Sequence, residues 1–181
     1  MDQGVTAGQL LLAEYGTVKD EQKARIGFRD NLLYVTLAVM AAVITAASQT
    51  DKPVMLLALP PVCAILGWTY LVNDQKISAI GAYVRTDLGP RLAAMARAGD
   101  DLRVFEWETA HRSDAGRTSR KFIQCLVDLG AFCVVPLGGL TVYWASGRTS
   151  GLLLGLSAAE ALAIVGLGVH VVLYARPQRS A

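Results

Sequence analysis

Four long apolar stretches restrict this chain to folds that place most of it in a lipid bilayer. They cover residues 32–48, 54–72, 122–145 and 152–175. A helix needs about 20 apolar residues to cross about 30 Å of hydrocarbon, and each stretch approaches or exceeds that length. Since the bilayer core contains no water, each crossing segment has to satisfy its own backbone hydrogen bonds, as an α-helix does. The sequence therefore predicts an all-α membrane protein with four transmembrane helices.

The 17 Lys and Arg residues are distributed unevenly around these stretches. All but Lys52 and Arg148 lie before the first stretch, between the second and third, or after the fourth. Basic segments remain on the cytoplasmic side of a membrane. We therefore expect a multi-pass protein of the bacterial inner membrane with both termini and the central connector in the cytoplasm. We expect no cleavable secretory signal, because the first 30 residues are charged and lack an apolar core.

The two short links, 49–53 and 146–150, predict that the spans pair as two antiparallel hairpins. The predicted organisation is a cytoplasmic amphipathic helix at 1–30, a hairpin at 31–73, a helical cytoplasmic link at 74–120, a second hairpin at 121–175 and a cytoplasmic tail at 176–181.

The N-terminal segment has apolar residues near a 3–4 spacing from Leu11 to Ile26, and no proline separates it from the first span. We expect one helix that begins near Ala7 and runs into the membrane. The second span helix is expected to continue to Gly89–Pro90, followed by a short helix through Met95. Together these segments predict a helical cap that could receive a cytoplasmic protein partner. Nucleic acid is not expected, because the basic residues alternate with acidic ones.

Small residues recur at every fourth position in two of the spans. Such strips allow helices to approach closely in lipid. They consist of Ala38, Ala42 and Ala46 in the first span, and of Gly151, Gly155 and Ala159 at the start of the fourth. Together they exceed what one hairpin contact requires, so we expect a homo-oligomer.

Prolines interrupt two of the spans, at Pro60–Pro61 and at Pro136. A proline inside a helix removes an amide donor and clashes with the preceding turn. Each site therefore predicts a helix break. It is either a kink required by packing, or a hinge or a pore-facing break.

Three ionisable residues lie inside the apolar stretches: Asp128, Glu160 and His170. Such residues are costly in lipid and usually face a bundle interior or a cavity. Counting back from the second hairpin's apex places Asp128 opposite His170, where a carboxylate and an imidazole favour an ion pair. Three interpretations remain open: a structural pair that fixes the hairpin register, a proton-sensing or ion-coordinating site, and a metal site.

The same count places Glu160 near the middle of the fourth span, opposite Gly138–Gly139. Two interpretations are open for this carboxyl group. It could be a protonated group that hydrogen-bonds between helices, or, in an oligomer, one member of a ring that lines a cation path.

No pattern in the sequence indicates a catalytic or cofactor site. We find no HExxH, GxSxG, P-loop or CxxC motif. The three cysteines, Cys63, Cys125 and Cys133, lie in apolar stretches and are expected to be packed thiols. We therefore expect no enzyme activity, no cofactor and no metal.

Several segments together resemble a protein family. They are 14–15 with 25–30, 66–70, 73–78 and 104–108. The chain resembles small four-span integral membrane proteins of unassigned function in high-G+C bacteria, and this likeness implies class and compartment without a catalytic role. In its layout it is also similar to four-span membrane effectors of bacterial immune systems, in which a sensor triggers membrane disruption.

These observations favour an oligomeric integral membrane module, a pore-forming or membrane-perturbing effector controlled through its cytoplasmic cap. The alternatives are a small proton-coupled transporter, an intramembrane enzyme and a purely structural membrane scaffold. The small number of polar groups in the spans argues against the intramembrane enzyme.

Overall fold

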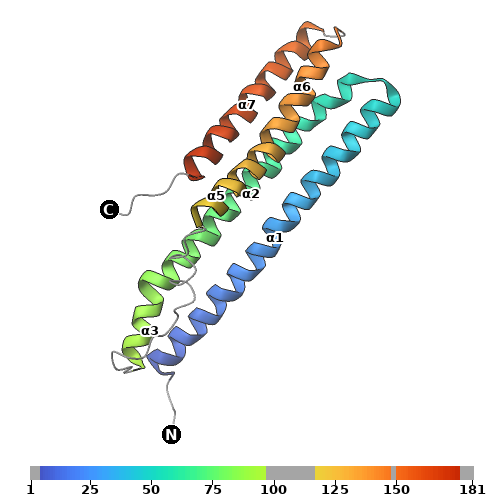
Figure 1. Ribbon diagram of the computed structural model, residues 1–181. Helices are drawn as coiled ribbons and strands as arrows, with labels where there is room; N and C mark the ends of the chain where they lie inside the picture. The colour runs from blue at the N-terminus through green and yellow to red at the C-terminus, as the bar shows by residue number, and fades with distance from the viewer. Residues whose placement is uncertain (1–4, 97–116, 148–149, 176–181) are drawn as a thin grey trace. The chain divides into compact units, whose positions relative to one another are not determined.

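The computed structural model describes residues 5–96, 117–147 and 150–175, and these ranges contain helices and no strand. The elements are α1 (Ala7–Thr50), η1 (Pro53–Ala58), α2 (Leu59–Tyr83), η2 (Val84–Leu88), α3 (Gly89–Met95), α5 (Arg117–Leu129), η3 (Gly130–Val134), α6 (Val135–Ala145) and α7 (Gly151–Ala175) (Figure 1). The predicted all-α fold is confirmed, since four helical segments of the described chain are long and apolar enough to cross a membrane. Residues 97–116 of the predicted link and the tail at 176–181 lie outside the described residues.

The chain divides into two compact units. Unit 1 comprises the described parts of Met1–Arg29 and Val72–Arg117, and unit 2 those of Asp30–Leu71 and Thr118–Ala181. Helix α1 contributes to both units and continues without a break for 44 residues. The predicted helix that runs from Ala7 into the first apolar stretch is therefore confirmed.

The packed face of α1 follows the spacing of three and four residues that is typical of helices in long contact. In unit 1, Leu11 is buried and packs with Val84, Leu88 and Leu92. The core of unit 2 contains the α1 residues Leu32, Met40 and Ala47. One continuous helix face thus supplies core residues to each unit.

A left-handed residue follows the end of α1. Asp51 has φ 50°, a conformation that Asp adopts more readily than most residues. The amide of Lys52 donates to the carbonyl of Ala47 at 3.3 Å and satisfies one of the last carbonyls of the helix. The chain then enters the 3₁₀ helix η1.

The prolines stand where one helix type changes to another. Pro60 and Pro61 are the second and third residues of α2, directly after η1, and Pro136 is the second residue of α6, directly after the π-helix η3. The first turn of an α-helix tolerates proline because its amides have no partner within the helix. The predicted breaks are therefore changes of helix type, and the hinge role of these prolines stays a prediction.

The expected short helix through Met95 is confirmed as α3, which carries Pro90 in its first turn, and the π-helix η2 joins it to α2. The π-helix η2 accommodates Pro90, with the Gly89 amide bonded to the carbonyl of Val84, and the chain continues into α3 through Met95. The wider turn accommodates the proline, so the long helix changes type before Gly89 and runs on into α3.

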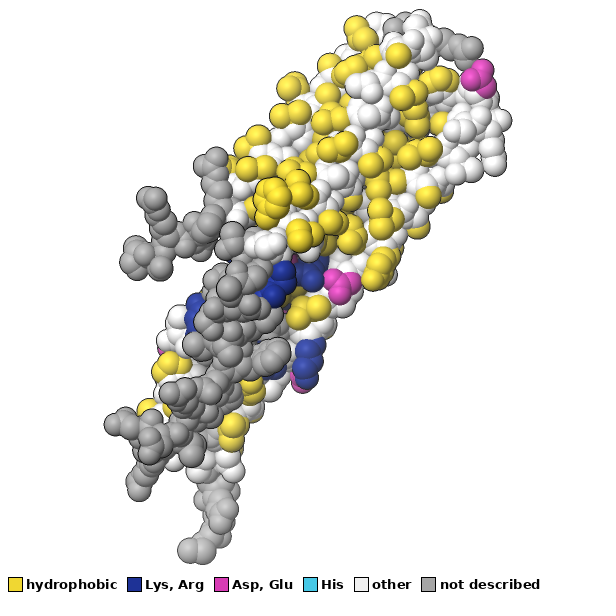
Figure 2. Space-filling model, in the orientation of Figure 1, with side chains coloured by type: hydrophobic (Ala, Val, Ile, Leu, Met, Phe, Trp, Pro, Cys, Tyr) yellow, Lys and Arg dark blue, Asp and Glu magenta, His cyan; other side chains and the backbone are white. Residues whose placement is uncertain are grey.

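Unit 2 has a small core and a large apolar surface. Phe132, Leu140, Tyr143 and Ile164 are completely or almost completely buried. Many large apolar side chains are nevertheless exposed, and hydrophobic side chains cover much of the face of this unit drawn in Figure 2. A water-soluble protein rarely exposes so much apolar area, so this surface fits contact with lipid.

Candidate functional site

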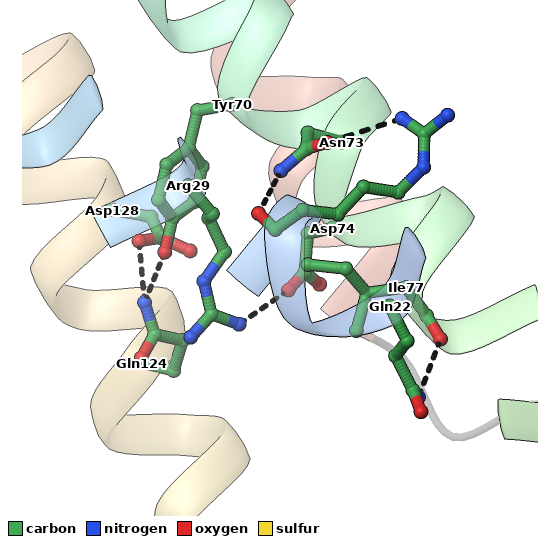
Figure 3. A network of polar contacts seen from close by, with 9 residues as sticks. Gln22, Arg29, Tyr70, Asn73, Asp74, Ile77, Gln124 and Asp128 are labelled. Atoms are coloured by element: carbon green, nitrogen blue, oxygen red, sulfur yellow. Dashed lines mark hydrogen bonds and ion pairs between the residues drawn. The ribbon is translucent and has the colours of Figure 1, made fainter. Parts of the chain in front are cut away.

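A group of polar contacts lies near the start of the apolar part of α1, at about residue 30, and near the end of the apolar part of α2, at about residue 72 (Figure 3). In unit 1, Arg29 of α1 forms an ion pair with Asp74 of α2, with 2.8 Å between Nη1 and Oδ1. Both side chains are about three-quarters buried. A pair this sheltered is screened less by salt than a surface pair, so it constrains the two helices more strongly.

Asn73, the residue before Asp74, joins α2 to Arg25, which lies one turn before Arg29 on α1. Its Nδ2 donates to the carbonyl oxygen of Arg25 at 2.7 Å, and its Oδ1 accepts from Nη1 of Arg25 at 3.4 Å. Glu21 holds the guanidinium of Arg25 from one turn earlier, at 2.5 Å from Nη2. Asn73 is 4% exposed, so leaving its amide unpaired would be costly.

Two further hydrogen bonds continue this register toward the start of α1. Gln22 Nε2 donates to the carbonyl of Ile77 at 3.4 Å, and the hydroxyl of Tyr83 donates to Glu14 at 2.5 Å. The hydrogen bond to the Glu14 carboxylate raises the pKa of Tyr83 above its ordinary value. From Arg25 through Gln22 to Glu14 the partners on α1 move toward the N-terminus, while those on α2 move from Asn73 through Ile77 to Tyr83, toward the C-terminus. The polar contacts thus describe one antiparallel register in unit 1.

In unit 2, Gln124 of α5 links α2 to the in-span carboxylate Asp128. Its Nε2 donates to Oη of Tyr70 at 2.5 Å and to Oδ1 of Asp128 at 2.8 Å (Figure 3). Tyr70 is 4% exposed and also packs against Phe132, with ring centroids 5.2 Å apart. The amide of Gln124 therefore holds Asp128 and Tyr70 at the same end of the α5 span.

His170 of α7 has an aromatic neighbour. Its ring meets the indole of Trp68 edge to face, with centroids 5.7 Å apart. Asp128 is thus described in contact with Gln124, and His170 in contact with Trp68. The ion pair between Asp128 and His170 stays a prediction.

Glu160 lies on the packed face of α7, where Ser157 and Ile164 are fully buried one turn to either side. Among the described residues, Oε2 of Glu160 and Oη of Tyr143 are buried polar atoms without a hydrogen-bond partner, as is Nη1 of Arg85 in unit 1. Such atoms are rare in folded proteins, so each needs a physical explanation. Both interpretations of Glu160, an interhelical donor and a path-lining group, stay open.

The space beside Gly139 is filled by apolar side chains. A methyl group added at Gly139 would meet Leu59 at 2.9 Å and Leu56 at 3.7 Å, and one added at Gly138 would meet nothing within 4 Å. Leu59 therefore packs directly against Gly139. On the next turn, the indole nitrogen of Trp144 donates to Oγ of Ser157 at 2.9 Å and joins α6 to α7.

The predicted small-residue strips lie largely on the outside of unit 2. Ala38, Ala42, Gly151, Gly155 and Ala159 are exposed and Ala46 is partly buried. A methyl group added at Gly151 or Gly155 would meet no atom within 4 Å. These strips therefore remain available for contacts beyond the chain's own packing.

Sequence reasoning missed the glycine that packing does require. A methyl group added at Gly67 would lie 2.7 Å from Leu167 and 2.9 Å from Phe132. It also missed Gln124, Asn73 and Asp74. The available signal was their position: each polar side chain lies within three residues of an end of an apolar stretch.

The described residues offer no metal site, because no group of three or more His, Cys, Asp or Glu side chains comes together there. Cys63, Cys125 and Cys133 are all free thiols. No family model, curated protein or solved structure matches the chain. The family likeness expected from the sequence therefore stays a prediction.

Proposed function

We propose that this protein is a four-span module of the bacterial inner membrane, with its spans paired as two antiparallel hairpins and unit 1 as a cytoplasmic helical cap. The observation that carries the proposal is the continuity of α1, which supplies both the polar contacts of unit 1 and core residues of unit 2. A displacement imposed on the cap can pass along this helix to the span without crossing a loop.

The cap contacts are suited to holding a resting state. A register shift of one turn would separate Arg29 from Asp74 and Arg25 from Asn73, and would break these sheltered polar contacts. A cytoplasmic protein that binds the cap and breaks these contacts would release α1 and α2 to move. Buried polar layers have this register-fixing role in other paired helices.

Several copies would assemble through the exposed strips that contain Ala38 and Gly155. In such an assembly the spans form a pore or disrupt the bilayer. Where they form a pore, Glu160 of each copy contributes a carboxyl group to the lining of the cation path. No catalytic step is required for this activity.

Dye and ion leakage from liposomes containing the purified full chain tests the proposal. We expect Asp74→Asn to raise the leak at least threefold, because it weakens the resting contact with Arg29. The exposed pair of Lys23 and Asp20 provides the matched control, so Asp20→Asn should leave the leak unchanged. Glu160→Gln should alter cation leakage. Background leakage from all four proteins would eliminate the pore.

A second candidate, a proton-coupled transporter, is favoured by the hydrogen bond that holds Asp128 within the α5 span. It predicts flux that saturates with substrate and follows a pH gradient, whereas a pore predicts neither. Assembly without leak or flux would leave the structural scaffold.

A further inference from the structure

Helix α5 exposes basic residues at the beginning of its span and apolar residues beyond them. The side chains of Arg120 and Lys121 are exposed, although both also interact within the protein. The exposed apolar side chains that follow are Phe122, Ile123, Leu126 and Val127. One helix of unit 2 thus presents positive charge beside a lipid-facing apolar surface.

The aromatic residues of α2 indicate the depth of α5 in the bilayer. Trp68 is about half exposed and Tyr70 lies two residues later. Trp and Tyr concentrate where the hydrocarbon meets the head groups. Gln124 of α5 donates to the hydroxyl of Tyr70 at 2.5 Å, so Gln124 also lies near the boundary between hydrocarbon and head groups.

Arg120 and Lys121 precede Gln124 by four and three residues. At a rise of 1.5 Å per residue, their backbone lies about 5–6 Å farther out, at the level of lipid phosphates. Asp128 lies about 6 Å in the opposite direction and accepts a hydrogen bond from Gln124 at 2.8 Å. The positive groups therefore lie at the phosphate level, with the acidic group deeper.

We propose that Arg120 and Lys121 bind the head group of an anionic phospholipid whose acyl chains lie along the exposed apolar residues of α5. Charge complementarity selects this lipid, because an anionic head group carries the net negative charge that attracts Arg120 and Lys121, and a zwitterionic head group carries none. Basic residues at a membrane surface each strengthen binding to anionic lipid by roughly fivefold. Two such residues should give a preference of roughly tenfold to thirtyfold.

Native mass spectrometry of the full chain, with equal amounts of phosphatidylglycerol and phosphatidylcholine of identical acyl chains, tests this proposal. We expect the wild type to retain phosphatidylglycerol about tenfold over phosphatidylcholine, and Arg120→Gln/Lys121→Gln to reduce the preference below threefold. The matched control Lys23→Gln/Lys52→Gln removes the same charge from exposed positions elsewhere and should keep it. Arg120→Lys should keep it as well.

Equal retention of the two lipids by the wild type would overturn the proposal, as would an equal loss in the control. Displacement of phosphatidylglycerol by millimolar inorganic phosphate would overturn it too, since it would indicate a general anion site. If the double glutamine variant does not fold, a salt titration of the wild type decides. The preference should decline as ionic strength rises, and a salt-independent preference would contradict the proposal. Lipid retention is read without any leakage assay, so it is independent of the pore.

Discussion

Arg29 and Asp74 lie 45 positions apart in the sequence and meet at 2.8 Å, where α1 and α2 pass between polar and apolar sequence. Arg29 is the last residue of its segment in unit 1, and Asp74 is the third of the segment that begins at Val72. The ion pair therefore ties together two helices of unit 1 that each continue into unit 2.

Removing one member of this pair should weaken unit 1. We expect Asp74→Asn to lower its unfolding free energy by roughly 1–2 kcal/mol, because the substitution removes the carboxylate charge that lies against the sheltered guanidinium of Arg29. Thermal unfolding of the detergent-solubilised full chain, followed by circular dichroism, provides the measurement. The same change at Asp20, whose pair with Lys23 is exposed, should have almost no effect. Equal effects at the two sites would show that Arg29 and Asp74 are not specially coupled.

The bond from Tyr83 to Glu14 predicts a dependence on alkaline pH. A raised pKa means that the folded state favours the protonated phenol, so the contribution is fully present below the ordinary pKa of tyrosine, about 10, and is lost as pH rises through the folded value. Stability of unit 1 should therefore fall above about pH 10 in the wild type and fall less in Tyr83→Phe.

Ultraviolet titration of the phenols checks this assignment. The difference between wild type and Tyr83→Phe should show one tyrosine that ionises later than free tyrosine. A midpoint at or below the free value would contradict the hydrogen bond to Glu14.

Gly67 should be intolerant of any side chain. A Cβ at this position would lie 2.7 Å from Leu167 and 2.9 Å from Phe132, and both neighbours are almost completely buried. We expect Gly67→Ala to destabilise unit 2 by roughly 1–3 kcal/mol through overpacking. Gly166→Ala is the matched control, because its Cβ would meet nothing within 4 Å and alanine favours the helix. Thermal unfolding in detergent should separate the two variants, and equal midpoints would contradict the packing described here.

The hydrogen bonds of Gln124 should contribute to the attachment of α5 to α2. Gln124→Leu removes the donor to Tyr70 and Asp128, and we expect a loss of roughly 1–2 kcal/mol in the stability of unit 2. Thr141 supplies a control, because its hydroxyl bonds only to the carbonyl of Gly138 within its own helix. Thr141→Val should therefore have a smaller effect in the same unfolding measurement.

The elements could be predicted from the sequence because their causes are local. The spans follow from apolar length, and the continuity of α1 follows from the absence of proline between Ala7 and Thr50. The pairing of Arg25 with Asn73 could not be derived, because it depends on the register of helices far apart in the chain. The π-helices could not be derived either. Sequence shows that Pro90 and Pro136 disturb a helix, but it does not distinguish a break from a widened turn.

The central claim is that the chain crosses the bilayer four times, with the connector between the second and third spans on the cytoplasmic side. Single-cysteine variants in a Cys63→Ser/Cys125→Ser/Cys133→Ser background test it with a membrane-impermeant thiol reagent on intact spheroplasts. We expect Thr50→Cys and Ser150→Cys to be labelled directly, and Gln75→Cys only after permeabilisation, since all three positions are exposed. Labelling of Gln75→Cys from the same side as Thr50→Cys would contradict the account.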